Sequence, residues 1–297
     1  MMKIAGHTMG TPELSIVEAA KLFSQMGLDA IEIVFQDNYH CGFNWNTTDQ
    51  EVNEYKKYLD SLGIEASCIV AYASDYNNLE DEKREAAIKE CKRCIQIAHI
   101  LSAKYVRIYG GTLLEVDGDF DEKRKVLVQS MRLLSGEGIM YGVGLVLENH
   151  YNTMTTGPKI TCDIVEEINR KNVGILYDQA NISFLSGEDY RACIKIQKDK
   201  IHYVHVKDFI FKNENVMFTA GSVSHVDENE RAVSSKIVGE GVLPWKEIIQ
   251  ELYSIGYDGY LSLEYERRWH PQDLPLAEIG MKKGMDHIRE IINNIKK

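Results

Sequence analysis

The chain has 297 residues, of which 44% are hydrophobic and 27% charged, and its formal net charge is −11. This length suits two small domains or one large α/β barrel, since such barrels often run to about 250 residues. The acidic charge argues against nucleic acid as a partner, because phosphate binding needs clustered Lys and Arg, and no run approaches the ~20 apolar residues that cross a membrane.

The start of the chain, MMKIAGHTMG, runs directly into strand-like sequence and lacks the features of a secretory signal, so we expect a cytoplasmic protein. Thr11 and Pro12 predict the N-cap and first turn of a helix that ends at Gly27. A second helix is expected between Thr48 and Gly63. Its buried face would carry Val52, Tyr55, Leu59 and Leu62.

Short β-rich runs alternate with amphipathic helical segments along the whole chain, which is typical of βα units and a parallel sheet. Eight strands are expected, at 3–7, 30–35, 64–70, 104–110, 143–149, 173–178, 201–206 and 260–265. With no Pro/Gly-rich linker between them, they predict an α/β fold, a single (β/α)8 TIM barrel that forms one domain over 1–297. A doubly wound sheet is the alternative, but no G-x-G-x-x-G follows a strand, so its dinucleotide-binding version has no support.

The six cysteines are scattered, as expected of reduced thiols. CKRC at 91–94 lies within a strong helical pattern, and no second pair completes a zinc site. We therefore interpret Cys91 and Cys94 as helix residues one turn apart.

Polar residues close seven of the predicted strands: His7, Glu32, Arg107, Glu148, Asp178, His205 and Glu264. The carboxyl ends of barrel strands converge where such enzymes keep their catalytic groups. Buried carboxylates need a partner, a hydrogen bond or a metal. Three carboxylates and one imidazole on the last four strands suit one divalent ion, Mn²⁺, Mg²⁺, Co²⁺ or Zn²⁺.

The motifs LVLENH, ILYDQAN, YVHVKD, VGEG and GYDGYLSLE, in this order, resemble the xylose isomerase-like barrel superfamily over essentially the whole chain. That superfamily includes sugar and sugar-phosphate isomerases and epimerases, dehydratases and AP endonuclease IV. The resemblance implies a metal site at Glu148, Asp178, His205 and Glu264. It also implies that Glu148 and Glu264 are catalytic and move a proton to and from the carbon beside a carbonyl, through a metal-stabilised enediolate.

Departures from the family patterns narrow this expectation. AP endonuclease IV has a histidine where this chain has Asn181, which argues against DNA repair. The pattern D-x-x-N, H-x-K-D and G-E-G is similar to pentulose-phosphate epimerases and inosose-processing enzymes, so the carbohydrate or polyol substrate stays open. We expect an isomerase or 3-epimerase-like enzyme. The alternatives are an inosose- or dehydroshikimate-type dehydratase and a non-catalytic sugar-binding barrel.

Further polar side chains near the strand ends are candidates for substrate binding: Lys207, His150, Asn181, Arg267, Glu32, Arg107 and His7. Lys207 should lie on the same side of its strand as His205, where it could hold substrate or form a salt bridge with a neighbouring carboxylate. Glu32 and Arg107 could equally pair with each other. Asp208 is expected to cap or support the site.

The stretch 209–238 is longer than the 2–6 residues of an ordinary βα loop. It could act as a lid or contribute to subunit contacts. The sequence is compatible with a homo-dimer or tetramer and does not decide the oligomeric state.

Overall fold

The computed structural model describes residues 1–113, 120–185, 188–212 and 231–295. Within these residues, eight parallel strands alternate with helices, and the chain is a (β/α)8 barrel as predicted. The bounds of the eight strands agree with the predicted runs to within two residues: β1 (Lys3–His7), β2 (Ala30–Phe35), β4 (Glu65–Ala71), β5 (Tyr105–Ile108), β6 (Gly144–Glu148), β7 (Val173–Tyr177), β8 (Ile201–Val206) and β11 (Tyr260–Leu263).

The helices follow the strands in chain order. They are α1 (Ile16–Met26), α2 (Asp49–Leu62), α3 (Asp81–Leu101), α4 (Phe120–Tyr141), α5 (Pro158–Ile168), α6 (Gln179–Leu185), α7 (Tyr190–Gln197), α8 (Trp245–Ser254) and α9 (Gly280–Ile295). Among the described residues, no helix is both long and apolar enough to cross a membrane.

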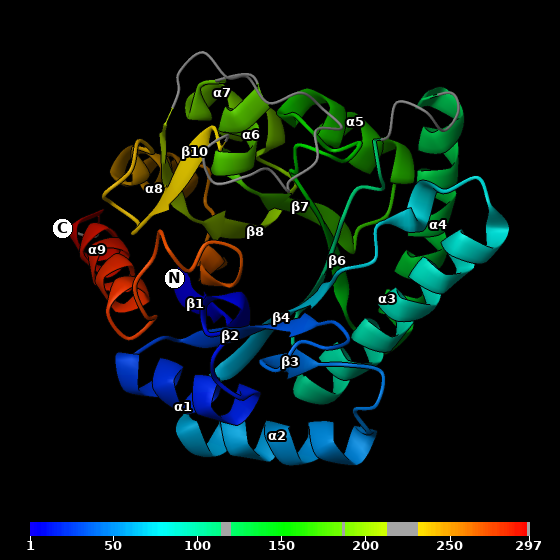
Figure 1. The fold of residues 1–297 in the computed structure, drawn as a ribbon. Coiled ribbons are helices and arrows are strands. Elements are labelled where there is room, and N and C mark those ends of the chain that lie inside the picture. Colours follow the sequence, from blue (N-terminus) through cyan, green and yellow to red (C-terminus); the bar gives the residue numbers. More distant parts are fainter. Residues whose placement is uncertain (114–119, 186–187, 213–230, 296–297) are drawn as a thin grey trace. The chain divides into compact units, whose positions relative to one another are not determined.

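The chain forms two compact units, and the first comprises described residues 1–67, 203–212 and 231–295. In it β2, β1, β11 and β8 lie side by side in parallel, with His7 level with Glu32 and Ser262 level with His205. Helices α1 and α2 lie next to each other, and α9 packs against β1 and β11 (Figure 1). This register places strand-end polar residues on neighbouring strands.

The second unit comprises described residues 68–113, 120–185 and 188–202. Strands β4, β5, β6 and β7 are parallel in that order, and α3 lies beside α4 (Figure 1). Cys91 and Cys94 are buried in α3, and all six cysteines of the chain are free thiols. The interpretation of CKRC as part of a helix is confirmed.

One predicted helix start is wrong. Helix α1 begins after Ser15, not after Thr11, because Ser15 and Glu18 form a reciprocal capping box. The Ser15 amide donates to the Glu18 carboxylate at 2.8 Å, and the Glu18 amide donates to Ser15 Oγ at 3.3 Å. Thr11 instead closes the short 3-10 turn Thr8–Gly10. The predicted end of α1 at Gly27 is confirmed by that residue's left-handed backbone, φ +87°.

The predicted long loop is ordered at both ends where the structure describes it. Strand β9 (Asp208–Phe211) pairs antiparallel with β10 (Val233–Lys236). These two strands form a ribbon directly after β8. Residues 213–230 lie outside the described part of the chain. A further short strand, β3 (Gly42–Phe43), pairs with β2.

Candidate functional site

The first unit buries a polar cluster at the ends of its strands. His7, Glu32 and His205 are fully buried, and Glu264, directly after β11, is 4% exposed. His7 also caps the following turn, since its Nδ1 accepts a hydrogen bond from the Met9 amide at 3.1 Å. Buried ionisable groups are stable only when they are paired.

Glu32 is surrounded by hydrogen-bond donors. Its Oε1 lies 3.2 Å from His205 Nε2, while its Oε2 accepts from the hydroxyls of Ser262 at 2.5 Å and Tyr203 at 3.3 Å. Burial would raise the pKa of Glu32, but the nearby imidazoles of His205 and His7 and these hydrogen bonds outweigh it, so the pKa lies below its ordinary value. Both oxygens of Glu32 therefore face hydrogen-bonding groups.

The other nitrogen of His205 faces Glu264. Nδ1 lies 3.4 Å from Glu264 Oε1. With its proton on Nε2, towards Glu32, a neutral His205 would present a lone pair on Nδ1 to this carboxylate oxygen. Two buried acceptors facing each other need a proton or a metal cation between them. In a tetrahedral site, two ligand atoms each lie about 2.1 Å from the ion, and the angle between them at the ion is about 110°. Such ligand atoms are about 3.4 Å apart, which is the distance between His205 Nδ1 and Glu264 Oε1, so the pair fits a metal centre.

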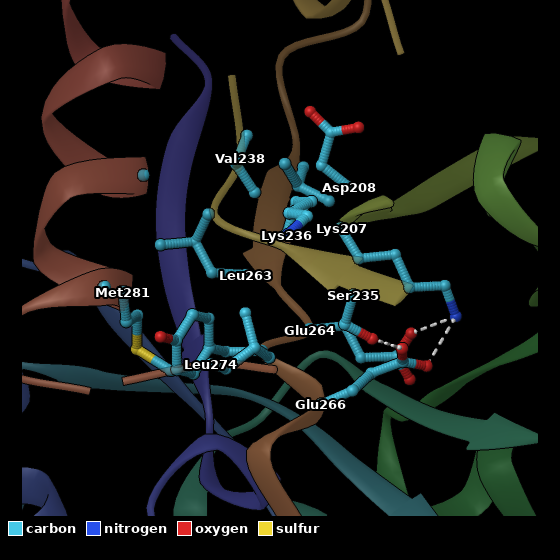
Figure 2. A pocket seen from close by; sticks show the side chains of 14 residues that line it. Lys207, Asp208, Ser235, Lys236, Val238, Leu263, Glu264, Glu266, Leu274 and Met281 are labelled. Carbon is cyan, nitrogen blue, oxygen red and sulfur yellow. Dashed lines mark hydrogen bonds and ion pairs between the residues drawn. The ribbon is translucent and has the colours of Figure 1, made fainter. Parts of the chain in front are cut away.

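The second oxygen of Glu264 is held by Lys207. Lys207 Nζ lies 2.7 Å from Glu264 Oε2 and 3.3 Å from Glu266 Oε1, and Ser235 on β10 donates to the other oxygen of Glu266 at 3.1 Å (Figure 2). Burial would raise the pKa of Glu264, yet His205 and Lys207 hold it well below its ordinary value. The structure thus shows the salt bridge that was one of the two predicted roles of Lys207.

Asp208 closes the turn that contains the V-G-E-G motif. Its carboxylate accepts hydrogen bonds from the amides of Phe209, Gly239, Gly241 and Leu243, at 3.0 to 3.1 Å. Burial nevertheless raises the pKa of Asp208. The predicted capping role of this residue is confirmed.

In the second unit, Glu148 lies at the end of β6 and Asp178 directly after β7, and both are fully buried. Asn181 lies against both carboxylates. Its Nδ2 is 2.9 Å from Asp178 Oδ2 and 3.3 Å from Glu148 Oε1. Asp178 also caps α6, because its Oδ1 accepts from the Asn181 amide at 2.9 Å. Within the described residues Asn181 Oδ1 is buried without a hydrogen-bond partner, so it can accept from a substrate hydroxyl.

Arg107 forms an ion pair with Glu148 inside the second unit. Its guanidinium lies 3.5 Å from the centre of the Tyr109 ring and donates to the Ala71 carbonyl at 3.2 Å. Burial would lower the pKa of Arg107, but Glu148 raises it. In place of the Glu32–Arg107 pair that the sequence left open, Arg107 pairs with Glu148 and Glu32 with His205.

Two other predicted substrate residues have well-defined neighbours. His150 stacks on Tyr151 with ring centres 4.5 Å apart. Arg267 Nε donates to Glu13 at 2.7 Å, and its NH1 donates to the Leu274 carbonyl at 2.6 Å. These contacts lie in the loops after β6 and β11. The substrate-binding roles of both residues stay predictions.

Sequence reasoning missed Tyr203 and Ser262, the two hydroxyl donors to Glu32. Each precedes a predicted ligand, His205 or Glu264, by two positions. Side chains two apart on a strand point to the same face, so strand alternation was a signal that could have identified both. Glu266 and Ser235 had no such signal, because the first lies beyond β11 and the second on an unpredicted strand.

The chain matches the model of the xylose isomerase-like TIM barrel over residues 20–291 and belongs to this family. The resemblance identified from the motifs is therefore confirmed. One curated relative is the inosose dehydratase of Geobacillus thermodenitrificans, 27% identical over 150 residues, which cover 50% of this chain and 48% of the relative. The match thus spans about half the length of that relative. Another is the 3-dehydroshikimate dehydratase of Bacillus anthracis, 22% identical over 252 residues, or 80% of this chain and 84% of the relative.

Solved structures share the fold across nearly the whole chain. A D-tagatose 3-epimerase-like protein has a TM-score of 0.77 at 18% identity, covering 99% of this chain and 98% of its own. An IOLI protein with a binding zinc atom has a TM-score of 0.75 at 20% identity, with the same coverage. At these identities the likeness shows the fold alone.

Proposed function

We propose that residues 1–297 act as one domain, a divalent-metal-dependent sugar or sugar-phosphate isomerase or epimerase of the 3-epimerase-like type. The observation that carries this proposal is the pair of facing buried acceptors, His205 Nδ1 and Glu264 Oε1, 3.4 Å apart. Family membership supports it, because the residues lie at strand ends of a barrel whose catalytic groups collect there.

The proposed ligands of one ion are Glu148, Asp178, His205 and Glu264. Oxygen and imidazole donors without thiolate fit Mn²⁺, Mg²⁺, Co²⁺ or Zn²⁺, and the zinc atom of the IOLI structure is compatible with this set. When bound, the ion would act as a Lewis acid that stabilises negative charge on substrate oxygens.

The proton transfer is assigned to Glu264 and Glu148. Lys207 keeps the Glu264 carboxylate ionised at neutral pH, so it can accept a proton from a carbon beside a carbonyl. Arg107 is the corresponding cation for Glu148. If one glutamate, ionised, removes the proton and the other, protonated, donates its own proton to the opposite face, the carbon is inverted. Protonation of the neighbouring carbon instead, with its hydroxyl proton passing to the former carbonyl oxygen, gives an isomer.

A dehydratase working on the same site is the second candidate, and two curated relatives with dehydratase names favour it. Its first step would be the same proton abstraction, followed by loss of a hydroxyl from the next carbon. Water loss from an inosose or dehydroshikimate, rather than epimer formation, would identify this reaction. A non-catalytic sugar-binding barrel is less well supported, since binding alone gives no reason to keep Glu264 buried and ionised.

The test compares Glu148→Gln and Glu264→Gln with the wild type, all at saturating Mn²⁺, over ketoses, pentulose 5-phosphates and inososes. An amide cannot act as a general base, so each variant should lose at least about 10²–10⁴-fold in turnover. Glu167→Gln, which removes a surface ion pair with Arg124, is the control and should keep full activity.

Isotope exchange separates the roles of the two glutamates. In D₂O, one variant is expected to exchange label into the substrate from its remaining glutamate without releasing inverted product. Full turnover by either variant at saturating metal would rule out the assignment.

A further inference from the structure

We propose that Glu32 is a positioning residue that fixes His205 in its Nε2–H tautomer and so keeps Nδ1 directed at a divalent cation. This inference rests on the proposed role of His205 as a metal ligand. It gives Glu32 a function different from the substrate contact expected from the sequence. All of the contacts involved lie within the first unit.

The two oxygens of the Glu32 carboxylate have different partners: Oε2 bonds two hydroxyls, and Oε1 faces the His205 imidazole. Ser262 at 2.5 Å and Tyr203 at 3.3 Å both donate to Oε2, while His205 Nε2 is the partner of Oε1 at 3.2 Å. Glu32 comes from β2, Ser262 from β11, and Tyr203 and His205 from β8. Three strands therefore hold the carboxylate in one orientation against the ring.

The chemistry of a carboxylate makes this contact directional. Oε2 of Glu32 accepts from two hydroxyls, as a carboxylate does, and a carboxylate only accepts hydrogen bonds, so the nitrogen beside Oε1 must carry the proton. A neutral imidazole has one N–H, and with that proton on Nε2 the lone pair lies on Nδ1, towards Glu264 Oε1. Carboxylates that accept from the second nitrogen of a histidine ligand orient the ring and raise its basicity.

The packing around His205 also opposes rotation of the ring. Tyr203 and His7 approach it edge-on, with ring centres 6.1 Å and 5.7 Å away. His205 is completely buried. A ring flipped about Cβ–Cγ would place carbon atoms where Nδ1 and Nε2 now lie, so the contact with Glu32 and the nitrogen facing Glu264 would both be lost.

A different use of the same residues would be a second ion held by His7, Glu32 and His205, whose ligand atoms lie within 4.8 Å of one another. That use would require His205 to give up its Nε2 proton and bridge two ions. It would also compete with the hydroxyls of Ser262 and Tyr203 for the lone pairs of Glu32. The orienting role needs neither change.

The experiment uses the full chain in four forms, with Glu32→Gln as the main variant and Glu32→Asp as its conservative partner. Ser262→Ala is the control, because it removes a donor to Glu32 but keeps the carboxylate. Two quantities are measured: the tautomer of His205 by ¹⁵N NMR of the metal-free protein at a pH where the ring is neutral, and the affinity and stoichiometry for Mn²⁺ and Zn²⁺ by chelator competition. Circular dichroism checks that each variant is folded.

The wild type should show the Nε2–H tautomer and bind one ion per chain. In Glu32→Gln the amide can donate to Nε2, so the Nε2–H tautomer should be lost and metal affinity should fall about 10–100-fold. Glu32→Asp should restore part of both, and Ser262→Ala should keep the tautomer and most of the affinity. If Glu32→Gln does not fold, the comparison of Glu32→Asp with the wild type carries the test.

The proposal is overturned if metal-free wild type has the Nδ1–H tautomer, or if folded Glu32→Gln keeps both tautomer and affinity. Two ions in the wild type and one in Glu32→Gln would make Glu32 a ligand instead. If the wild type binds no metal, the proposed function fails, while the tautomer measurement still decides the role of Glu32.

Discussion

Replacing Lys207 by Met removes the ammonium group from Glu264 while keeping a side chain of similar length. Both partners are almost fully buried, with side-chain exposures of 7% for Lys207 and 4% for Glu264. At their separation of 2.7 Å, an effective dielectric constant of 20 gives an attraction of about 6 kcal/mol, part of which is offset by desolvation of Lys207. Removing one partner of a buried pair costs about 3–5 kcal/mol, and we expect that loss in the metal-free protein.

The loss should depend on pH and on metal. The pKa of Glu264 lies well below its ordinary value near 4.5 in the folded protein. A carboxyl with a lowered folded-state pKa stabilises the fold above its unfolded pKa, and this contribution disappears as the pH falls through the folded pKa. The stability gap between wild type and Lys207→Met should therefore be largest at neutral pH and narrow below about pH 4.5. A divalent ion on Glu264 would replace the missing positive charge, so saturating Mn²⁺ should also narrow the gap.

Urea unfolding of both proteins at pH 7.5 and pH 4, with and without Mn²⁺, measures these differences. Lys282→Met is the matched control, because Lys282 pairs with Asp286 on the exposed side of α9 and should contribute less than about 0.5 kcal/mol. A gap below about 1 kcal/mol in the metal-free protein at pH 7.5 would refute the reasoning that Lys207 compensates a buried charge.

Two further predictions concern packing and reactivity. Gly241→Ala should destabilise the protein by about 1–3 kcal/mol, because the new methyl group would lie 2.0 Å from Asp208 Oδ1. Gly136→Ala in α4 is the matched control: no atom lies within 4 Å of its new methyl group, so it should stabilise the protein by about 0.5–1 kcal/mol. Urea unfolding checks both changes, and equal effects would contradict this account. Burial raises the pKa of the Cys91 and Cys94 thiols. Neither thiol should therefore react with a thiol reagent at pH 8 until the protein unfolds. Rapid labelling of Cys91 or Cys94 in the native protein would contradict this expectation.

The sequence predicted the strands well because each is a short buried run between helical segments with clear ends. Helix α2, for example, begins after Thr48 and ends at the left-handed Gly63, as expected. The start of α1 was mispredicted, because Thr11–Pro12 and Ser15–Glu18 both carry helix-start signals. Only the second pair forms the reciprocal bonds. The prediction of one domain over 1–297 stays a prediction.

The sequence predicted which residues lie in the candidate site and at which strand ends. It did not predict which of them form hydrogen bonds or ion pairs with each other. Strand-end logic selected Glu32, Arg107 and Lys207, yet their partners depend on which strands are neighbours and at what register. Arg107 is beside Glu148 because β5 and β6 are adjacent, and Glu32 shares the donors of β8 and β11. Neighbours across a sheet are set by tertiary structure, which local patterns do not encode.

The ribbon of β9 and β10 has a consequence for how this protein can evolve. Its register places Ser235 opposite Phe209, and this is the position from which Ser235 reaches Glu266. A shift of one residue would bring Ser234 or Lys236 to that position and reverse the faces of the strand. Insertions and deletions in the chain between the two strands are therefore tolerated only when the ladder re-forms in the same alignment. The connecting sequence can then change while Ser235 still holds Glu266, and Glu266 still holds Lys207 beside Glu264.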